Sequence, residues 1–105
     1  MKINDRTVHS EEEILSELQK EFNQTIEFVI LDNGDNYFIQ TSGGVLEYHA
    51  GEKHYYIAQI PVPQDKIEAA FISYYRNDGK YLNDFEWQKE NHETLWSKIK
   101  KLFSK

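Results

Sequence analysis

Apolar and polar residues alternate through residues 25–61, in four short runs separated by three segments that each contain Gly. Alternation with a period of two is typical of strands that bury one face. The separating segments, 32–35, 41–44 and 50–53, have the residue types that tight hairpin turns require. The pattern therefore predicts an antiparallel meander of four strands, or of a slightly larger number, in this part of the chain.

The turns determine which side chains share a face of the predicted sheet. A two-residue turn on the Asn-Gly pair of the first hairpin places Phe28 opposite Ile39. A two-residue turn in the third hairpin places Tyr48 opposite Tyr55. The second hairpin can close at either of two adjacent positions, and both choices give the same faces. The predicted inner face contains Ile26, Phe28, Ile30, Tyr37, Ile39, Leu46, Tyr48, Tyr55 and Ile57.

The opposite face of the predicted sheet is mixed in character. A meander with one apolar and one mixed side is expected when helices cover only the apolar side. Val29 and Phe38 leave a second interpretation open, in which a further helix packs on the mixed side. The mixed face contains Glu27, Gln40, Glu47, His49, His54 and Tyr56, with Val29, Leu31, Phe38 and Val45 among them.

Helical spacing predicts one helix before the meander and one after it. The first begins at Ser10, which forms a capping box with Glu13. The second is predicted over residues 64–76. Pro61 and Pro63 precede it, and residues 77–79 end it, with Gly79 as the predicted left-handed cap. In the first helix, the apolar residues that face inward are Ile14, Leu15, Leu18 and Phe22, and the polar residues that face away are Glu12, Glu17, Gln19 and Glu21. In the second helix, the inward-facing residues are Ile67, Ala70, Phe71 and Tyr74.

The remaining segments complete one predicted domain over residues 1–105. A third helix is predicted over residues 91–103, and residues 80–87 form a connector with a short strand around Phe85. The first eight residues are ambiguous, with a short edge strand through Ile3 as one alternative. The predicted class is α+β, with an antiparallel four-stranded or slightly larger meander and three helices mainly on one face. The stripe of the third helix is His92, Leu95, Trp96, Ile99 and Phe103.

Composition limits the location and the chemistry. The 105 residues suffice for one hydrophobic core, and the absence of Cys excludes disulfides, thiolate metal sites and cysteine nucleophiles. No apolar run approaches the roughly 20 residues of a membrane span, and the first residues lack the apolar block of a signal peptide. We therefore expect a cytoplasmic protein with no membrane partner.

The charge is distributed unevenly along the chain. Eighteen acidic residues against twelve basic ones give a net charge of −6, and up to Ser97 the count is 18 against 8, or −10. Such a body repels nucleic acid and anionic lipid and attracts a basic partner. Acidity that serves only solubility is the open alternative. The basic residues after Ser97 are Lys98, Lys100, Lys101 and Lys105.

One set of residues could support catalysis or metal binding. Glu47, His49 and His54 are predicted to be neighbours across the third hairpin, and two imidazoles with a carboxylate can bind zinc or carry protons. Asp32 and Asp35 flank the Asn-Gly turn, where Asp is a favoured turn residue. The chain has no HExxH motif, phosphate-binding loop or nucleophile elbow. We expect no catalytic, metal or cofactor residues, and a small metal-dependent or acid–base enzyme that uses the first three residues is the alternative.

Four segments resemble the first-numbered immunity-protein family of bacterial polymorphic and contact-dependent toxin systems. They are YFIQTSGGV at 37–45, YYIA at 55–58, AAFISYY at 69–75 and DFEW at 84–87, and the resemblance spans about residues 10–88. The chain departs from the family pattern by its basic segment after Trp87. The resemblance implies a cytoplasmic α+β antidote that binds a cognate toxin domain, commonly a nuclease or deaminase, and performs no chemistry itself.

The resemblance and the acidic body together predict how such a protein acts. Acidic side chains pair with cationic substrate-binding residues of the toxin in a 1:1 complex, and aromatic side chains exclude water. Direct contact with nucleic acid is not expected. The residues expected to bind the partner are Glu47, Glu52, Tyr56, Asp78, Asp84 and Glu86.

Overall fold

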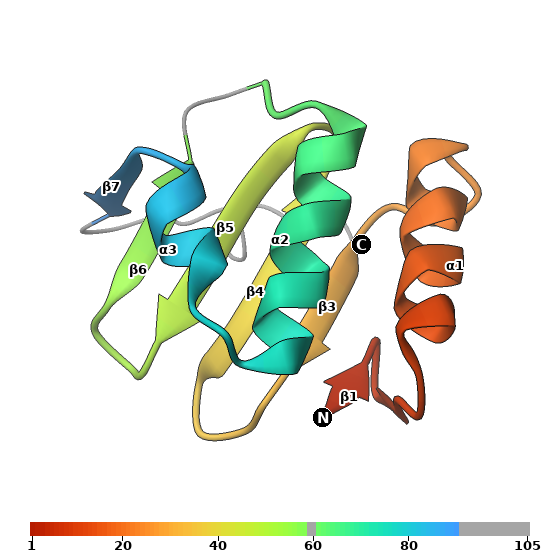
Figure 1. Ribbon diagram of the computed structural model, residues 1–105, viewed down its shortest axis with the longest axis horizontal. Helices are drawn as coiled ribbons and strands as arrows, with labels where there is room; N and C mark the ends of the chain where they lie inside the picture. The colour runs from red at the N-terminus through yellow and green to blue at the C-terminus, as the bar shows by residue number, and fades with distance from the viewer. Residues whose placement is uncertain (59–60, 91–105) are drawn as a thin grey trace, which may run out of the picture.

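The computed structural model describes residues 1–58 and 61–90, and within them the chain is α+β. In chain order the elements are β1 (Lys2–Ile3), β2 (Arg6–Thr7), α1 (Glu11–Phe22), β3 (Val29–Asp32), β4 (Tyr37–Ser42), β5 (Val45–Ala50), β6 (Tyr55–Ala58), α2 (Gln64–Arg76), α3 (Lys80–Asp84) and β7 (Trp87–Glu90). The strands form an antiparallel sheet in the order β2-β1-β3-β4-β5-β6-β7. The helices lie on one side of this sheet (Figure 1).

The predicted class is confirmed, and the sheet is larger than the predicted four strands. Ile3 is 1% exposed in β1, so the alternative of an edge strand through it is confirmed. Asn4 and Asp5 make the tight turn to β2 with φ of 45° and 70°, a region that Asn and Asp tolerate better than most residues. At the other edge, the short strand predicted around Phe85 lies two residues later, as β7.

The first helix has the predicted start but a wider buried face than predicted. The Glu13 backbone N–H donates to Ser10 Oγ at 3.3 Å, and the Glu13 carboxylate accepts from the His9 backbone at 3.3 Å. Glu17 and Glu21, predicted to face away, are only 6% and 7% exposed. Each is buried with polar partners. Leu15, predicted to face inward, is 36% exposed.

The partners of these two glutamates explain their burial. Glu17 Oε1 pairs with Arg6 Nη2 at 2.5 Å and with Lys20 Nζ at 2.9 Å. Glu21 Oε2 accepts from the backbone N–H of Gly43 at 3.2 Å, which ties the end of α1 to the β4–β5 turn. A helical-spacing pattern treats every carboxylate as solvated, so it misses the two that bind neighbouring elements.

The second helix has the predicted bounds and buries its predicted stripe, so Ile67, Ala70, Phe71 and Tyr74 belong to the core. Its left-handed cap is Asn77, with φ of 57°, and not Gly79. Gly79 instead precedes α3, a helix in the segment predicted as a connector. The predicted third helix, residues 91–103, lies outside the described residues.

The β3–β4 hairpin corrects one predicted register. Asp32 pairs with Phe38, so Ile39 faces Leu31 and not Phe28. The turn is longer than predicted, because residues 33–36 form a loop that holds three successive residues at positive φ. A register change by an odd number of residues moves a strand's side chains to the other face. Val29 and Leu31 are therefore buried beneath the helices, in place of Phe28 and Ile30.

The β5–β6 hairpin corrects a second register. Tyr48 pairs with Tyr56 and His49 with Tyr55, one residue away from the prediction. The loop has three residues, closed by a hydrogen bond of 2.8 Å from the Ala50 N–H to the His54 carbonyl. Tyr56 therefore lies on the helix-covered face. The middle hairpin closes on Gly43-Gly44, one of its two predicted positions.

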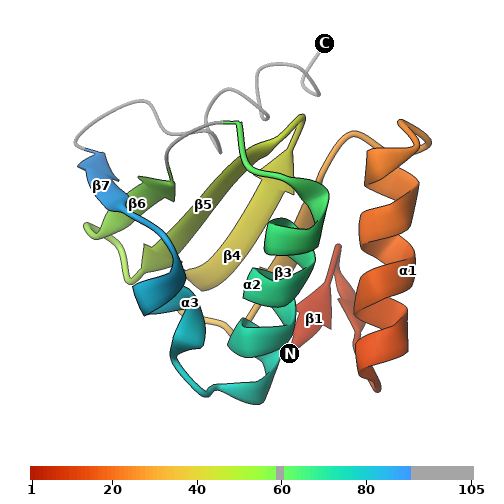
Figure 2. The same cartoon turned by 45° about the horizontal axis from the view of Figure 1, so that its top comes forward.

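The helix-covered face of the sheet forms the core. Figure 2 shows α1, α2 and α3 on the same side of the sheet, with α2 over β3 and β4. An aromatic cluster holds α3 and β7 to β5 and β6: Trp87 and Tyr81 meet the Tyr48 ring edge to face, at centroid distances of 4.6 and 5.5 Å. Burial, with the charges of Tyr56 and Tyr81, raises the pKa of Tyr48 to about 12. The sheet residues of this face include Ile3, Val29, Leu31, Ile39, Thr41, Leu46, Tyr48, Tyr56, Ala58 and Trp87.

Candidate functional site

The face of the sheet turned away from the three helices, here called the reverse face, contains a hollow of about 840 Å³. Its wall combines the β1–β2 turn, the chain between α1 and β3, the β3–β4 loop, and residues of β3 and β4. Typical ligand pockets span about 300–1,000 Å³, so the hollow has the size of a binding site. The described residues that line it are Asn4, Asp5, Thr25, Ile26, Glu27, Phe28, Ile30, Asp32, Asp35, Asn36 and Phe38.

Asn4 holds two sides of the hollow together. Its side-chain amide donates to the Phe28 carbonyl at 3.1 Å and accepts from the Ile30 N–H at 2.8 Å. Its backbone N–H also donates to the Ile30 carbonyl at 3.0 Å. The amide thus replaces a strand neighbour where β1 ends, because it satisfies backbone groups of β3 that would otherwise lack a partner.

The β3–β4 loop places two carboxylates at one end of the hollow. Asp32 Oδ1 accepts from the Gly34 N–H at 2.7 Å, a local bond that Asp and Asn favour in turns. Asp35 and Asn36 follow with φ of 54° and 66°. The predicted role of Asp32 and Asp35 as turn residues is confirmed. The structure adds that both also line the hollow.

The lining is acidic and apolar. It includes four carboxylates, and none of its described residues is Lys, Arg or His. Lys2 pairs in register with Asp32 on the neighbouring strand but does not line the hollow. A site of this kind favours a ligand with both a positive charge and apolar groups. The carboxylates are Asp5, Glu27, Asp32 and Asp35, and the apolar lining residues are Ile26, Phe28, Ile30 and Phe38.

Three buried polar side chains of β4 and β5, Gln40, Glu47 and His49, lie next to the hollow. Glu47 Oε1 accepts from Gln40 Nε2 at 3.3 Å and contacts His49 Nε2. The His49 ring stacks on Phe38 with centroids 4.1 Å apart, and Phe38 is also part of the hollow's wall. Gln40 and Glu47 are 0% exposed and His49 is 3% exposed. Phe38 and His49 are register partners and share one face of the sheet, so this group lies beside the hollow, where the stack restrains the Phe38 ring.

The residues expected to bind a partner lie on different parts of the molecule. Glu47 is 0% exposed on the reverse face, whereas Tyr56 is on the helix-covered face and stacks on Tyr48 with centroids 4.8 Å apart. Glu52 is exposed at the β5–β6 turn, and Asp84 and Glu86 are exposed near α3. These residues do not form one surface. The prediction placed Tyr56 on the same face as Glu47, and the corrected β5–β6 register separates the two.

Asp78 has a local role in the fold. Its Oδ1 accepts from Ser73 Oγ at 2.5 Å and from the Lys80 N–H at 3.0 Å, joining the end of α2 to the start of α3. The hydrogen bond from Ser73, and the one from the Lys80 backbone, hold the pKa of Asp78 below its ordinary value. Asp78 therefore remains charged at neutral pH while it caps the connection.

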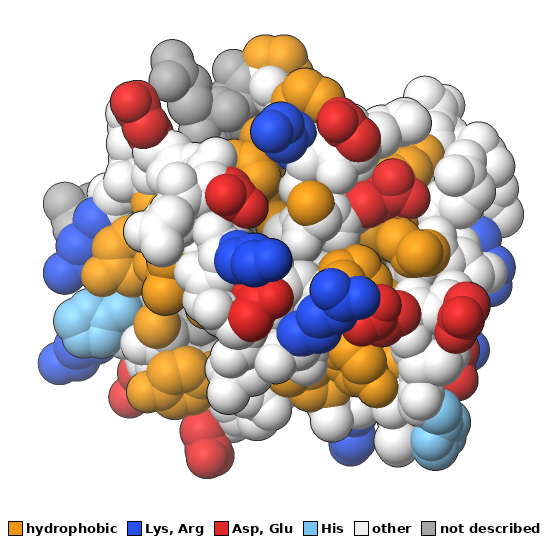
Figure 3. All heavy atoms as spheres, in the orientation of Figure 1, with side chains coloured by type: hydrophobic (Ala, Val, Ile, Leu, Met, Phe, Trp, Pro, Cys, Tyr) orange, Lys and Arg blue, Asp and Glu red, His pale blue; other side chains and the backbone are white. Residues whose placement is uncertain are grey.

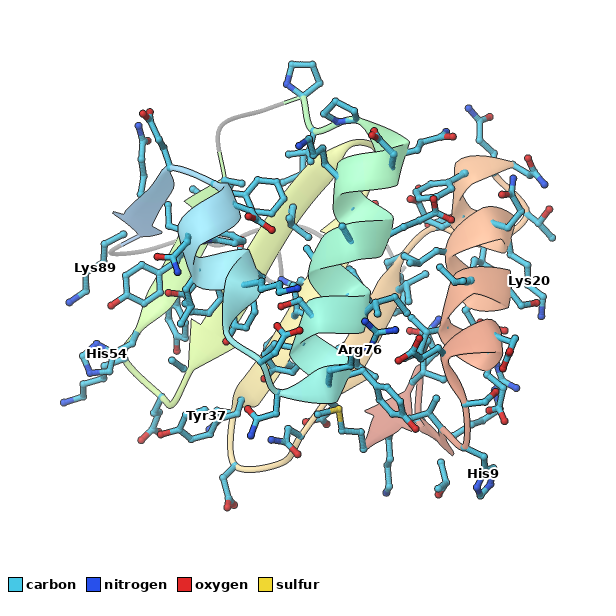
Figure 4. All side chains as sticks on the ribbon, viewed as in Figure 1. His9, Lys20, Tyr37, His54, Arg76 and Lys89 are labelled. Carbon is cyan, nitrogen blue, oxygen red and sulfur yellow. The ribbon has the colours of Figure 1, made fainter. Side chains whose placement is uncertain are left out.

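The helix-bearing surface has a mixed charge. Figure 3 shows acidic and basic side chains interspersed over this side of the molecule. Arg76 of α2 points toward α1 (Figure 4) and makes a bidentate pair with Glu11, at 2.6 and 2.8 Å. Ion pairs of this kind neutralise carboxylates on the helix-bearing surface, whereas the carboxylates of the hollow have no basic residue in the described lining. The hollow is therefore the better candidate for a cationic ligand.

The three residues of the alternative enzyme hypothesis are not assembled as predicted. Glu47 and His49 are in contact, but His54 lies at the β5–β6 turn and is exposed (Figure 4). The corrected register pairs His49 with Tyr55, which moves His54 to the other face. Within the described residues, no group of three His, Cys, Asp or Glu side chains is placed to hold a metal ion.

Comparisons with protein-family models, with curated protein sequences and with solved structures each found no match for this chain. In the part of the chain that the structure describes, no helix has both the length and the apolar character needed to cross a membrane.

Proposed function

We propose that this protein is an immunity protein, which neutralises a cognate toxin by taking cationic groups of the toxin into the reverse-face hollow. One observation carries the proposal: carboxylates from three parts of the chain border an apolar wall, and the described lining has no basic side chain. The net charge of −6 and the resemblance of residues 37–45 and 84–87 to an immunity-protein family also support it.

A lysine or arginine side chain gains two kinds of contact in such a hollow. Its aliphatic stem can lie against Phe28 and Ile30 while its charged end pairs with carboxylates at the rim. Charge-assisted hydrogen bonds are about twice as strong as neutral ones, and partial exclusion of water strengthens them further. The acidic body adds long-range attraction, which raises the association rate over a range of about 8–10 Å at physiological salt.

A basic toxin is the partner that fits this chemistry best. Enzymes that act on nucleic acids bind phosphates with Lys and Arg side chains. A protein that pairs with those side chains blocks the substrate without performing a reaction. The proposed complex is 1:1 and contains no nucleic acid, and the antidote needs no cofactor.

The test is a protection assay in cells. The toxin candidate encoded next to this protein is expressed alone and together with it, and we expect survival only in the second case. A variant with Glu27→Gln, Asp32→Asn and Asp35→Asn should lose protection and bind the toxin at least about tenfold more weakly, because each substitution removes one charge pair. Asn preserves the Asp32 turn bond and suits the φ of 54° at position 35.

A matched control removes the same charge elsewhere. The control variant carries Glu52→Gln, Asp84→Asn and Glu86→Gln, which are exposed and outside the described lining of the hollow. We expect it to protect as well as the natural protein. Loss of protection in the control with full protection by the hollow variant would place the contact on the other surface. If the protein protects cells against no toxin candidate, the proposed function itself is contradicted.

A further inference from the structure

The carboxylates of the hollow form two groups at opposite ends of its wall. Asp32 ends β3 and Asp35 follows in the loop, whereas Glu27 precedes the strand. Glu27 lies in a bend two residues before β3. The four residues of β3 advance about 10 Å at roughly 3.3 Å per residue, so Glu27 lies before one end of that length and Asp32 at the other end. Asp5 lies in the β1–β2 turn, next to Asn4, whose side-chain amide is hydrogen-bonded to Phe28 and Ile30.

Apolar side chains lie between the two acidic ends. Phe28 and Ile30 lie between Glu27 and Asp32 along the chain, and Phe38 of β4 lies beside the Asp32 end as the register partner of Asp32. The hollow is thus a strip with an anionic end, an apolar middle and a second anionic end. A single compact cation can occupy only one end of such a strip.

We propose, on the basis of the function proposed above, that the occupant is an extended segment of the partner with one basic residue toward each end and an apolar residue between them. In an extended chain, residues i, i+2 and i+4 point to one side and span about 13 Å. Long Arg or Lys side chains cover the remaining distance to the carboxylates. In a helix, residues i and i+4 lie only about 6 Å apart, so a short helical segment cannot reach both ends.

The probe is a fluorescently labelled peptide, acetyl-Arg-Ser-Leu-Ser-Arg-amide, measured by anisotropy with the full chain. The control peptide, acetyl-Arg-Arg-Leu-Ser-Ser-amide, has the same composition and charge but adjacent cations. We expect the first to bind at least about tenfold more tightly, because only it places a cation at both ends. Equal affinities for the two peptides, or no binding of either, would overturn the inference.

Protein variants locate the binding at the two ends. Glu27→Gln and Asp32→Asn should each weaken the spaced peptide about five- to tenfold, while Glu12→Gln on α1 leaves it unchanged. Lys2→Gln should strengthen binding about two- to threefold, because Lys2 is the cross-strand neighbour of Asp32 and competes for its charge. Binding that is insensitive to both acidic substitutions would refute the assignment.

Two results separate this inference from the proposed function. Toxin protection with no preference between the peptides overturns the extended-segment inference and leaves the immunity function standing. If the protein prefers the spaced peptide but protects cells against no toxin, the inference is supported and the immunity function is contradicted. A third result concerns the chain's own basic residues. If the spaced peptide binds only after Lys98, Lys100 and Lys101 are changed to Gln, these lysines compete with the peptide for the hollow, and the inference is overturned.

Discussion

Short polar side chains determine much of the local geometry. Asn4 satisfies the backbone of β3 where β1 ends, and Asp32 closes the start of the loop that follows. Asp35 and Asn77 hold left-handed backbone conformations that most residues avoid. The same residue types thus shape the hollow and, at Asp32 and Asp35, give it charge. Amide substitutions separate these two contributions, because Asn keeps the turn chemistry and removes the charge.

Glu17 gives a pH-dependent prediction at this scale. Burial raises its pKa, but hydrogen bonds from Lys20 and Arg6 outweigh that effect, so the pKa lies below its ordinary value. A lowered folded-state pKa stabilises the fold above the unfolded-state pKa, and this stabilisation is lost as pH falls through the folded-state pKa. We expect Glu17→Gln to lower the free energy of unfolding by about 1 kcal/mol at pH 7.

The measurement is urea unfolding of both proteins at several pH values. The difference between Glu17→Gln and the natural protein should shrink below pH of about 4.5, where the carboxylate becomes protonated. Glu12→Gln, an exposed change one turn earlier in α1, should show no comparable pH dependence. A difference that stays constant from pH 7 to pH 3 would contradict the role assigned to the ion pairs.

At the scale of elements, periodicity predicted α1 and α2 well but missed α3, which lies in a segment predicted as a connector. The bounds of α2 and the start of α1 agree with the prediction, because capping residues and apolar stripes act locally. The four central strands were also correct in position. Their registers in the first and third hairpins were wrong, since each loop has more residues than the assumed two. Loop length depends on which residues adopt positive φ, and several neighbouring Asn, Asp and Gly residues offered similar choices.

These register errors explain why sequence reasoning missed the candidate site. With Phe28 and Ile30 assigned to the core, Asp32 and Glu27 had no shared surface, and the partner-binding residues were expected elsewhere, at Glu47, Glu52, Tyr56, Asp78, Asp84 and Glu86. The turn at Asn4 and Asp5 had a usable signal, because that pair favours tight hairpins. Its contact with β3 depends on residues 26 positions apart in the chain, which periodicity does not report.

The aromatic cluster gives a prediction for the edge of the sheet. The Trp87 ring contacts the rings of Tyr48 and Phe85 edge to face. Its Nε1–H donates to the Tyr81 carbonyl at 2.9 Å. We expect Trp87→Ala to lower the free energy of unfolding by about 2–3 kcal/mol, because it removes packing that joins α3 and β7 to the sheet. Chemical denaturation followed by far-ultraviolet circular dichroism measures this loss.

A nearby exposed residue serves as the control for that substitution. Leu82 of α3 is 46% exposed, so Leu82→Ala should change stability by less than about 0.5 kcal/mol. Similar effects of the two substitutions would show that the cluster does not hold this edge together.

At the scale of the whole molecule, the two faces of the sheet have different roles in this account. The helix-bearing side carries the core and a surface of mixed charge (Figure 3), and the reverse face carries the acidic hollow. In the proposed complex, the net charge of −6 attracts a basic partner and the hollow determines where that partner binds. Overall acidity was evident from composition, but its concentration around an apolar strip required the three-dimensional structure.

The most direct test maps the proposed contact by nuclear magnetic resonance, with isotope-labelled protein titrated with the toxin domain proposed as its partner. The account predicts that the largest amide shifts fall in the hollow, at Asp5, Glu27, Asp32 and Asp35, while Glu52, Asp84 and Glu86 change little. Large shifts confined to that second group, with the hollow unchanged, would contradict the account.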